Sequence, residues 1–352
     1  MAQPSEIGVG LVGYGLAGRS FHGPFIDVVD GLRLNAIATS NPERRAQATA
    51  EHPDARVVGT TEALLDRGDV EVVVVVSPNR FHVPIGIQAL GAGRHVVVDK
   101  PIGMDVPEAE GLIEAAVRAG RLLSVYQNRR WDGDFLTVQR LVADGALGQI
   151  DSVESRFERF IPIGDGWRET AEEAGGPLHD LGSHLVDQSL LLLGRARRVW
   201  AQADRRRPGG RIDDSVFVAI DHADGGRSRL WTSLIASRGG PRVRVRGLAG
   251  EYIKDEFDPQ EGQLLVGMSP DAPGFGEDPP ERWGRLTSPD GSAVPVPTER
   301  GAHRRYYELF RDAVRGDGLL PVDPMDSIRG LRVLEAAVRS ARTGAAEVIA
   351  EA

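Results

Sequence analysis

Short apolar runs and helix-length segments alternate along the first third of the chain. Residues 7–12 form an apolar run of strand length that leads into a glycine-rich turn. Further runs of this kind follow at residues 32–38, 72–76, 95–98 and 122–126, and segments with helical character lie between them at 42–51, 81–92 and 107–119. Such alternation indicates parallel strands joined by crossover helices. The pattern predicts an α/β domain over residues 1–127, built as a doubly wound Rossmann sheet.

The pattern changes after residue 127. Strand-like runs separated by Gly, Pro and Asp clusters now dominate, which is typical of antiparallel hairpins. They lie at residues 150–161, 199–203, 215–220, 228–235 and 242–246, and helices are expected at 133–143, 180–193, 302–314 and 325–343. Residues 128–352 are therefore expected to form an α+β domain with an open, mostly antiparallel sheet that binds substrate and mediates oligomerisation.

Composition narrows the classes of function. The 352 residues carry a formal net charge of -9 and no cysteine. The negative charge argues against nucleic-acid or anionic-membrane partners, and the lack of cysteine excludes disulfides, thiolate catalysis and cysteine-bound metal. No segment has the length and apolarity of a membrane helix, and residues 1–6 do not resemble a signal peptide, so a cytoplasmic location is expected.

The glycine-rich turn reads Gly13-Tyr14-Gly15-Leu16-Ala17-Gly18 and lies between a strand and a helix. In this context the first glycine permits the tight turn, the second lets a pyrophosphate approach the backbone, and the third lets helix and sheet pack closely. The helix N-terminus then offers N–H groups to the phosphates. The turn predicts a dinucleotide site made by these six residues.

The end of the second predicted strand favours NADP over NAD. An acidic residue there would bind the ribose hydroxyl of NAD, but this chain has Ser40 and Asn41. Arg44 and Arg45 follow one helical turn later and could pair with a 2′-phosphate. The alternative is that both arginines are solvated and that Glu43 restores a preference for NAD.

Two later strand exits lie where a parallel sheet presents its ligand crevice. The first carries Ser77, Pro78, Asn79 and His82, of which Asn79 and His82 could line the nicotinamide; alternatively, Asn79 caps the next helix. The second exit reads Asp99-Lys100-Pro101. Lys100 could stabilise the oxyanion that develops as a hydride leaves a substrate carbon, or it could simply pair with Asp99.

A second candidate cluster lies on the predicted helix at residues 180–193. Asp180 and His184 are four residues apart and would share one face of that helix. An imidazole, with an ordinary pKa of about 6.5, suits the removal and return of a hydroxyl proton near neutrality. Asp180 would orient it, or Asp180 could cap the helix with His184 as a structural partner. Because His179, Asp180 and His184 have no matching second cluster, no metal is expected.

Two groups of arginines are expected to have structural or surface roles. Arg205, Arg206 and Arg207 precede a Pro-Gly-Gly turn and are expected to be solvated. Arg242, Arg244 and Arg246 alternate with valines, so they should share one sheet face, where they meet a partner subunit or protect an open sheet.

Together, the glycine turn, Lys100-Pro101 and Asp180-Leu181-Gly182-Ser183-His184-Leu185-Val186-Asp187 resemble the Gfo/Idh/MocA oxidoreductase family over essentially the whole chain. The segment at residues 123–132, LSVYQNRRWD, looks closest to NADP-dependent scyllo-inositol dehydrogenases of this family. One departure is Asp99, where the family commonly has glutamate.

The resemblance implies a dehydrogenase that moves a hydride between NADP, or NAD, and a secondary alcohol of a cyclic polyol or sugar. It implies catalytic roles for Lys100, Asp180 and His184, with His184 as the proton acceptor. Asp99 and Asn128 would also contact the cofactor, and Arg129, Trp167 and Arg168 would join the catalytic residues around the substrate.

Two alternatives remain beside this interpretation. One is an NAD-dependent sugar or trans-dihydrodiol dehydrogenase with the same residues. The other belongs to a different class, a sensor or regulator that binds the dinucleotide without catalysis. The expected partners are a small polyol or sugar and further copies of the chain in a homodimer or homotetramer.

Overall fold

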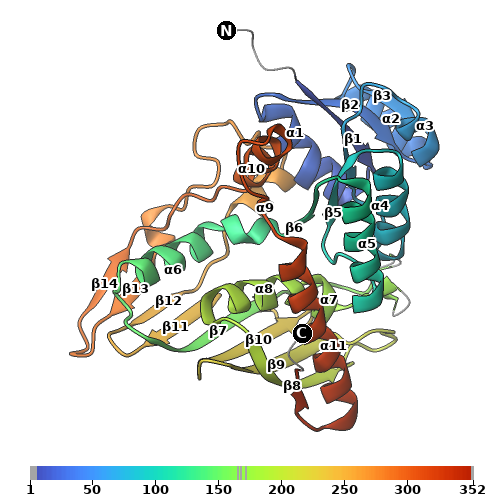
Figure 1. Ribbon diagram of the computed structural model, residues 1–352. Coiled ribbons are helices and arrows are strands. Elements are labelled where there is room, and N and C mark those ends of the chain that lie inside the picture. The colour runs from blue at the N-terminus through green and yellow to red at the C-terminus, as the bar shows by residue number, and fades with distance from the viewer. Residues whose placement is uncertain (1–5, 165, 167–168, 171–172, 350–352) are drawn as a thin grey trace. The chain divides into compact units, whose positions relative to one another are not determined.

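The computed structural model describes residues 6–164, 166, 169–170 and 173–349 (Figure 1). The chain forms two compact units, and each is described by itself. The first contains residues 1–128, 260–275 and 302–328, and the second contains residues 129–259, 276–301 and 329–352. The domain boundary after residue 127 stays a prediction.

The first unit is built on a six-stranded sheet in the order β3-β2-β1-β4-β5-β6, and every neighbouring pair is parallel. Its strands are β1 (Ile7–Val12), β2 (Leu32–Ala38), β3 (Arg56–Val58), β4 (Val72–Val75), β5 (His95–Asp99) and β6 (Leu123–Tyr126). The valine-rich strand β4 is buried along its whole length, as a strand covered on both faces should be. The predicted doubly wound parallel sheet is confirmed.

Helices connect these strands. They are the π-helical turn η1 (Gly18–His22), α1 (Gly23–Val28), α2 (Pro42–Glu51), α3 (Thr61–Leu65), the 3-10 turn η2 (Asn79–Phe81), α4 (His82–Gly91) and α5 (Val106–Ala119). Side chains satisfy the first N–H groups of several of them. Asn41 caps α2 by accepting from the Arg44 N–H at 2.9 Å, and Asp105 caps α5 by accepting from the Glu108 N–H at 2.9 Å.

Segments from late in the chain complete the first unit: α9 (Gln260–Leu265) and α10 (Arg304–Arg315). Tyr306, Tyr307 and Phe310 of α10 are buried, and the Tyr306 ring meets the Tyr126 ring of β6 edge-on, with 4.8 Å between centroids. Helix α10 therefore packs its aromatic face against the end of the parallel sheet.

The second unit contains a nine-stranded sheet in the order β14-β13-β12-β11-β7-β10-β9-β8-β15. Its strands are β7 (Ile150–Glu158), β8 (Ala196–Asp204), β9 (Ser215–His222), β10 (Arg227–Ser233), β11 (Val243–Gly247), β12 (Glu251–Lys254), β13 (Gly284–Thr287), β14 (Ala293–Val296) and β15 (Glu347–Val348). Strands β7 and β10 pair in parallel, and the other neighbouring pairs are antiparallel. The predicted open, mostly antiparallel sheet is confirmed.

Helices α6 (Gly133–Ala143) and α8 (Gly182–Leu193) lie over one face of this sheet (Figure 1). Val138 and Leu141 of α6 form a buried cluster with Val153, Val245 and neighbouring strand residues. Strand β9 alternates buried and partly exposed positions, as a strand covered on one face does. The remaining elements are η3 (Asn128–Trp131), α7 (Pro177–Asp180), η6 (Pro280–Arg282) and α11 (Pro324–Thr343).

Arg207 does not lie in a solvated turn, as the sequence led us to expect. Its guanidinium is buried and donates to both carboxylate oxygens of Glu169, at 3.0 and 2.9 Å, and its Nε lies 3.3 Å from Asp214 Oδ2. Arg242 departs from the expectation in a similar way. It is buried and its Nε lies 2.9 Å from Asp134 Oδ2, whereas Arg244 and Arg246 both pair with Glu251.

Among the described residues, no helix combines the length and the apolar character needed to cross a lipid bilayer.

Candidate active site

The glycine turn has the geometry that its spacing predicts. Gly13 has a φ of 106°, and a Cβ there would lie 2.3 Å from the Val76 carbonyl oxygen. A Cβ on Gly18 would lie 2.2 Å from the Gly13 carbonyl oxygen. At Gly15 the nearest atom to an added Cβ is Nη1 of Arg44, at 3.6 Å. The backbone at Gly15 is therefore open on the side where a phosphate would approach, and a cation lies beside that opening, so these residues fit a dinucleotide.

The two neighbouring arginines of α2 point to different places. Arg44 reaches the glycine turn, but Nη1 of Arg45 lies 3.5 Å from the position of a Cβ on Gly59. Ser40 is exposed at the carboxyl end of β2, and Asn41 uses its side-chain oxygen to cap α2. Of the two arginines, Arg44 is therefore the one beside the phosphate-binding turn.

Tyr14, inside the glycine turn, is buried and stabilises the loop. Its hydroxyl donates to Glu51 Oε2 at 2.6 Å, and Glu51 also accepts from Arg19 Nε at 2.9 Å. Burial and then the Glu51 carboxylate raise the pKa of Tyr14 well above its ordinary value. The side chain thus anchors the turn to α2, while the Leu16 side chain is 55% exposed.

At the exit of β4, the His82 imidazole is enclosed by backbone. Its Nδ1 lies 2.8 Å from the Pro101 carbonyl oxygen, and its Nε2 lies 2.9 Å from the Ser77 carbonyl oxygen. Burial lowers the pKa of His82. A neutral imidazole donates to one of these two carbonyls, according to its tautomer, and lies against the other, so His82 links the two strand exits. Asn79 is buried at the start of η2, and the N-cap residue of α4 is Phe81.

Lys100 lies directly after β5, joined to Pro101 by a cis peptide bond. The Asp99 carboxylate turns back onto this exit, because Oδ1 accepts from the Lys100 N–H at 2.8 Å. Its Oδ2 lies 3.9 Å from His22 Nε2. Burial alone would raise the pKa of Asp99, but His22 and then the charge of Lys100 outweigh burial and lower it. Asp99 is thus an ionised group whose carboxylate accepts from the backbone of Lys100.

Asn128, after β6, lies beside another segment of the first unit. Its Nδ2 is 3.5 Å from Nδ1 of His303, and the His303 N–H donates to Gln260 Oε1 at 2.9 Å. His303 and Gln260 were not predicted as site residues. They come from segments far along the chain, and nothing in their local sequence pattern points to this position.

The sequence predicted one continuous helix for Asp180 and His184 in the second unit. The structure places them on two separate helices. Asp180 ends α7, Leu181 separates the two helices, and His184 lies in the first turn of α8. Pro177 begins α7, and Gly182, a poor helix former, begins α8 directly after Leu181. His184 is 6% exposed. Beside Asp180, burial lowers the pKa of His179 to about 4.

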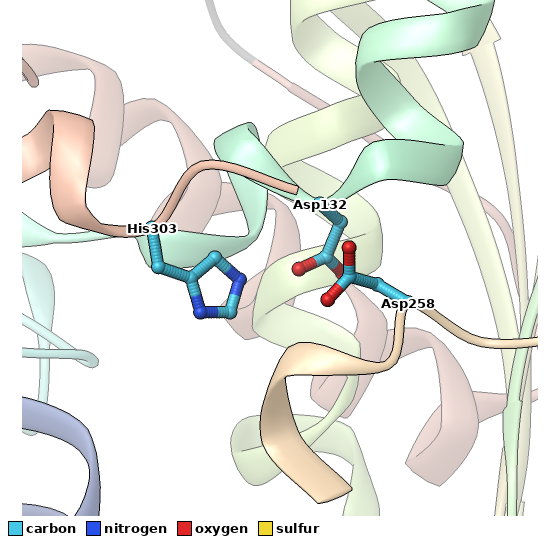
Figure 2. Close-up of side chains that lie close together, drawn as sticks. All are labelled: Asp132, Asp258 and His303. Carbon is cyan, nitrogen blue, oxygen red and sulfur yellow. The ribbon is translucent and has the colours of Figure 1, made fainter. Parts of the chain in front are cut away.

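Arg129 is held within the second unit. Its Nη1 donates to Asp132 Oδ2 at 3.1 Å, its guanidinium stacks 4.6 Å from the centre of the Phe157 ring, and its carbonyl accepts from Gln188 Nε2 at 2.7 Å. Figure 2 shows Asp132 with Asp258, which accepts from the Gly133 N–H at 2.7 Å; the figure also labels His303 of the first unit. Each carboxylate has a donor in its own unit, which compensates for its burial.

Trp167 and Arg168, predicted to close the substrate pocket, lie outside the described residues. Described residues on both sides of that pair contact Arg207. Glu169 accepts from Arg207, and the Ile161 carbonyl accepts from Arg207 Nη1 at 3.3 Å.

Comparison with known proteins places this architecture in a family. Residues 7–127 match the model of the oxidoreductase family's NAD-binding Rossmann fold, and residues 139–349 match the model of its C-terminal alpha/beta domain. The chain belongs to the Gfo/Idh/MocA oxidoreductase family. The resemblance drawn from its motifs is confirmed.

Two curated relatives and one solved structure illustrate the match. The scyllo-inositol 2-dehydrogenase (NADP(+)) IolW of Bacillus subtilis is 36% identical over 96% of this chain and 94% of its own length. The D-glucoside 3-dehydrogenase of Escherichia coli is 31% identical over 65% of this chain and 70% of its own. The structure of yvaA from Bacillus subtilis has a TM-score of 0.93 at 34% identity and covers 98% of this chain and 99% of that one.

The prediction of an NAD(P)-dependent dehydrogenase is confirmed at the level of the family, and a nicotinamide dinucleotide is its cofactor. The individual roles of the site residues, the absence of a metal requirement and the oligomeric state stay predictions.

Proposed function

We propose that the protein is an NADP-dependent dehydrogenase that oxidises a secondary alcohol of a cyclic polyol, such as scyllo-inositol, or of a sugar. The position of Arg44 carries the choice of cofactor. Its guanidinium lies at the glycine turn, while the carboxyl end of β2 carries Ser40 in place of an acid. A hydroxyl tolerates a 2′-phosphate, and a guanidinium can bind it through two hydrogen bonds.

Relatives support the substrate class. Two relatives that align over most of this chain are named as NADP(+) enzymes. One is the scyllo-inositol dehydrogenase, and the other is the D-xylose 1-dehydrogenase of Haloferax volcanii, which is 28% identical over 88% of this chain and 90% of its own length. A third is named a D-glucoside dehydrogenase. All three names describe oxidation of a polyhydroxylated small molecule, so the same chemical class is proposed here.

The nicotinamide would supply the hydride acceptor, and the chain's own side chains would handle the proton and the developing charge. In the proposed reaction the substrate hydroxyl gives its proton to His184. Lys100 stabilises the negative charge that develops on that oxygen as the carbon loses its hydride. Asp180 orients these groups, and Arg129 contributes to the substrate side. The products are a ketone, a reduced cofactor and a proton held on His184.

The test is a turnover screen of inositols and pyranose sugars with NADP and with NAD, followed at the absorbance of the reduced nicotinamide. Reduction of NADP by at least one inositol or sugar is expected. Lys100→Ala and His184→Ala should each lower kcat by about 100-fold or more, since each removes a proton-transfer or charge-stabilising group. Arg118→Ala is the matched control, because Arg118 is an exposed cation of α5 that pairs with Glu114 in the same helix. Near-normal turnover in both Lys100→Ala and His184→Ala would contradict the mechanism.

A further inference from the structure

A π-helical turn places one buried histidine beside the exit of β5. Residues 18–22 form this turn, in which the Gly23 N–H bonds to the Gly18 carbonyl. Pro24 follows and has no N–H to continue the α-helical ladder. An extra residue in a helical turn re-aims the side chains around it, and such turns are frequent at functional sites. His22, the last residue of the turn, has no exposed surface.

The His22 ring is held on both sides by aromatic residues of the first unit. Its Nδ1 lies 2.6 Å from the Tyr307 hydroxyl, and its ring centre lies 4.1 Å from that of Tyr126. Its other nitrogen, Nε2, lies 3.9 Å from Asp99 Oδ2 and has no hydrogen-bond partner among the described residues. An Nε2 that carries the proton faces the carboxylate favourably, and Nδ1 can then accept from the Tyr307 hydroxyl.

The same carboxylate reaches the exit that carries Lys100. Asp99 Oδ1 accepts from the Lys100 N–H at 2.8 Å, so the two oxygens of one carboxylate face His22 and Lys100. The hydrogen bond at Oδ1 ties the carboxylate to the backbone of Lys100, and the His22 imidazole lies 3.9 Å from the other oxygen, close enough for a favourable charge contact. Tyr307, His22, Asp99 and Lys100 thus form one chain of polar contacts through the first unit.

We propose that His22 is a positioning residue: its Nε2–H holds the Asp99 carboxylate, and Asp99 in turn holds Lys100 at the cofactor-facing edge of β5. The catalytic part of this inference rests on the proposed function. The Asp99 side chain has a single methylene. Its carboxylate therefore stays close to its own backbone, and the histidine supplies the contact that fixes its second oxygen.

Packing alone does not account for a histidine at this position. A buried imidazole loses hydration at both nitrogens, and only Nδ1 regains a hydrogen bond, so an apolar residue of similar size would fit the aromatic pocket at lower cost. The titratable groups that face the ring or its carboxylate partner are Asp99, Tyr307, Tyr126, Lys100 and His82. Asp99 is the acidic one among them.

The first experiment tests the contact without any substrate. In 15N-histidine-labelled protein, the His22 signal is assigned by its loss in His22→Leu, and its protonated nitrogen is read from the ring shifts. A proton on Nε2 is expected, with a shift in the Nε2 resonance when Asp99→Asn removes the carboxylate charge. The proposal would be overturned if Nε2 is unprotonated, or if the chemical shift of Nε2 does not change in Asp99→Asn.

The second experiment tests the role in catalysis. His22→Leu should lower kcat about tenfold, the effect of losing one orienting contact, and change KM for NADP much less. His22→Gln, whose amide N–H can replace Nε2–H, should recover most of the loss, and Tyr307→Phe should give an intermediate value. In the Asp99→Asn background, His22→Leu should have little further effect.

The outcomes separate this inference from the proposed function. If wild type turns over no polyol or sugar, the proposed substrate class fails, while the nitrogen shifts still decide whether His22 holds Asp99. If wild type is active but His22→Leu and His22→Gln lose kcat equally, or His22→Leu acts in full without the Asp99 carboxylate, the histidine is only a packing residue and the inference is wrong.

Discussion

Arg44 and Arg45 are adjacent in the chain and identical in charge, yet their guanidinium groups reach different parts of the first unit. Arg44 lies at Gly15 of the phosphate-binding turn, and Arg45 lies at Gly59. We therefore expect Arg44→Ala to lower kcat/KM for NADP by about 10- to 100-fold, since a charge-assisted contact to a phosphate contributes roughly 1.5–3 kcal/mol. The efficiency with NAD should change far less.

Arg45→Ala is the matched control for this prediction, because it removes the same charge from the same helix. The ratio of kcat/KM for NADP to that for NAD should fall more in Arg44→Ala than in Arg45→Ala. Equal falls in the two variants would mean that the arginines act through general charge and not through position. Ser40→Asp is expected to move the ratio in the same direction as Arg44→Ala, since a carboxylate would repel the 2′-phosphate.

The stability of the fold should depend on pH through His179. His179 is partly buried, and desolvation of its imidazole lowers the pKa in the folded state from the ordinary 6.5 to about 4. Between those values the unfolded chain binds a proton that the folded chain does not, so the contribution of His179 is complete above pH 6.5 and is lost as the pH falls toward 4. One such group lowers the free energy of unfolding by up to about 2 kcal/mol between pH 7 and pH 5.

Urea unfolding of wild type and His179→Gln at these two pH values measures that contribution. Wild type should lose more stability than the variant on acidification, because glutamine does not titrate. If wild type and His179→Gln lose the same free energy of unfolding, titration of His179 does not cause the acid sensitivity of the fold in this range.

Site residues were predictable where one local pattern determines the geometry, and not where the contact is distant. The spacing of Gly13, Gly15 and Gly18 already implies the turn that the structure shows. The pairing of His22 with Tyr307 joins residues 285 positions apart, and Arg207 meets Glu169 across 38 positions. The direction of a side chain could not be predicted either, since nothing in the local sequence distinguishes Arg44 from Arg45.

At the scale of elements, strands and helices with strong local signals were predicted closely. Strand β2, helix α2 and helix α6 have the predicted bounds, and β4 is one residue shorter than the valine run. The three-residue strand β3 was missed because it is too short to show a period. Strands β7 and β10 pair in parallel, which no hairpin pattern could indicate. The helical pattern is continuous through Leu181, yet the structure has two helices, α7 and α8, on either side of it.

The start of α6 gives an element-scale prediction. A Cβ on Gly133 would lie 2.3 Å from the Glu299 carbonyl oxygen, so Gly133→Ala must displace backbone and should destabilise the protein by roughly 1–3 kcal/mol. Gly111, in the middle of α5, has no atom within 4 Å of the same position. There, Gly111→Ala should stabilise the protein by up to about 1 kcal/mol through helix propensity.

Thermal unfolding of the two single variants beside wild type decides between packing and propensity. The midpoint should fall for Gly133→Ala and rise for Gly111→Ala. A Gly133→Ala midpoint at or above that of wild type would show that the contact between α6 and the segment at Glu299 relaxes without cost.

At the scale of the whole molecule, cofactor choice can be read from stability with no substrate present. A ligand that binds the folded state alone, at 100 times its Kd, adds about 2.7 kcal/mol to the free energy of unfolding. For a chain of 352 residues this corresponds to a rise of about 4 °C in Tm. NADP should therefore raise Tm at micromolar concentrations at which NAD has little effect, and Arg44→Ala should remove most of the difference. A wild-type protein that NAD stabilises as well as NADP does would contradict the proposed preference for NADP. The proposal of alcohol oxidation would still stand, because it depends on Lys100 and His184 and not on the residues around the 2′-position.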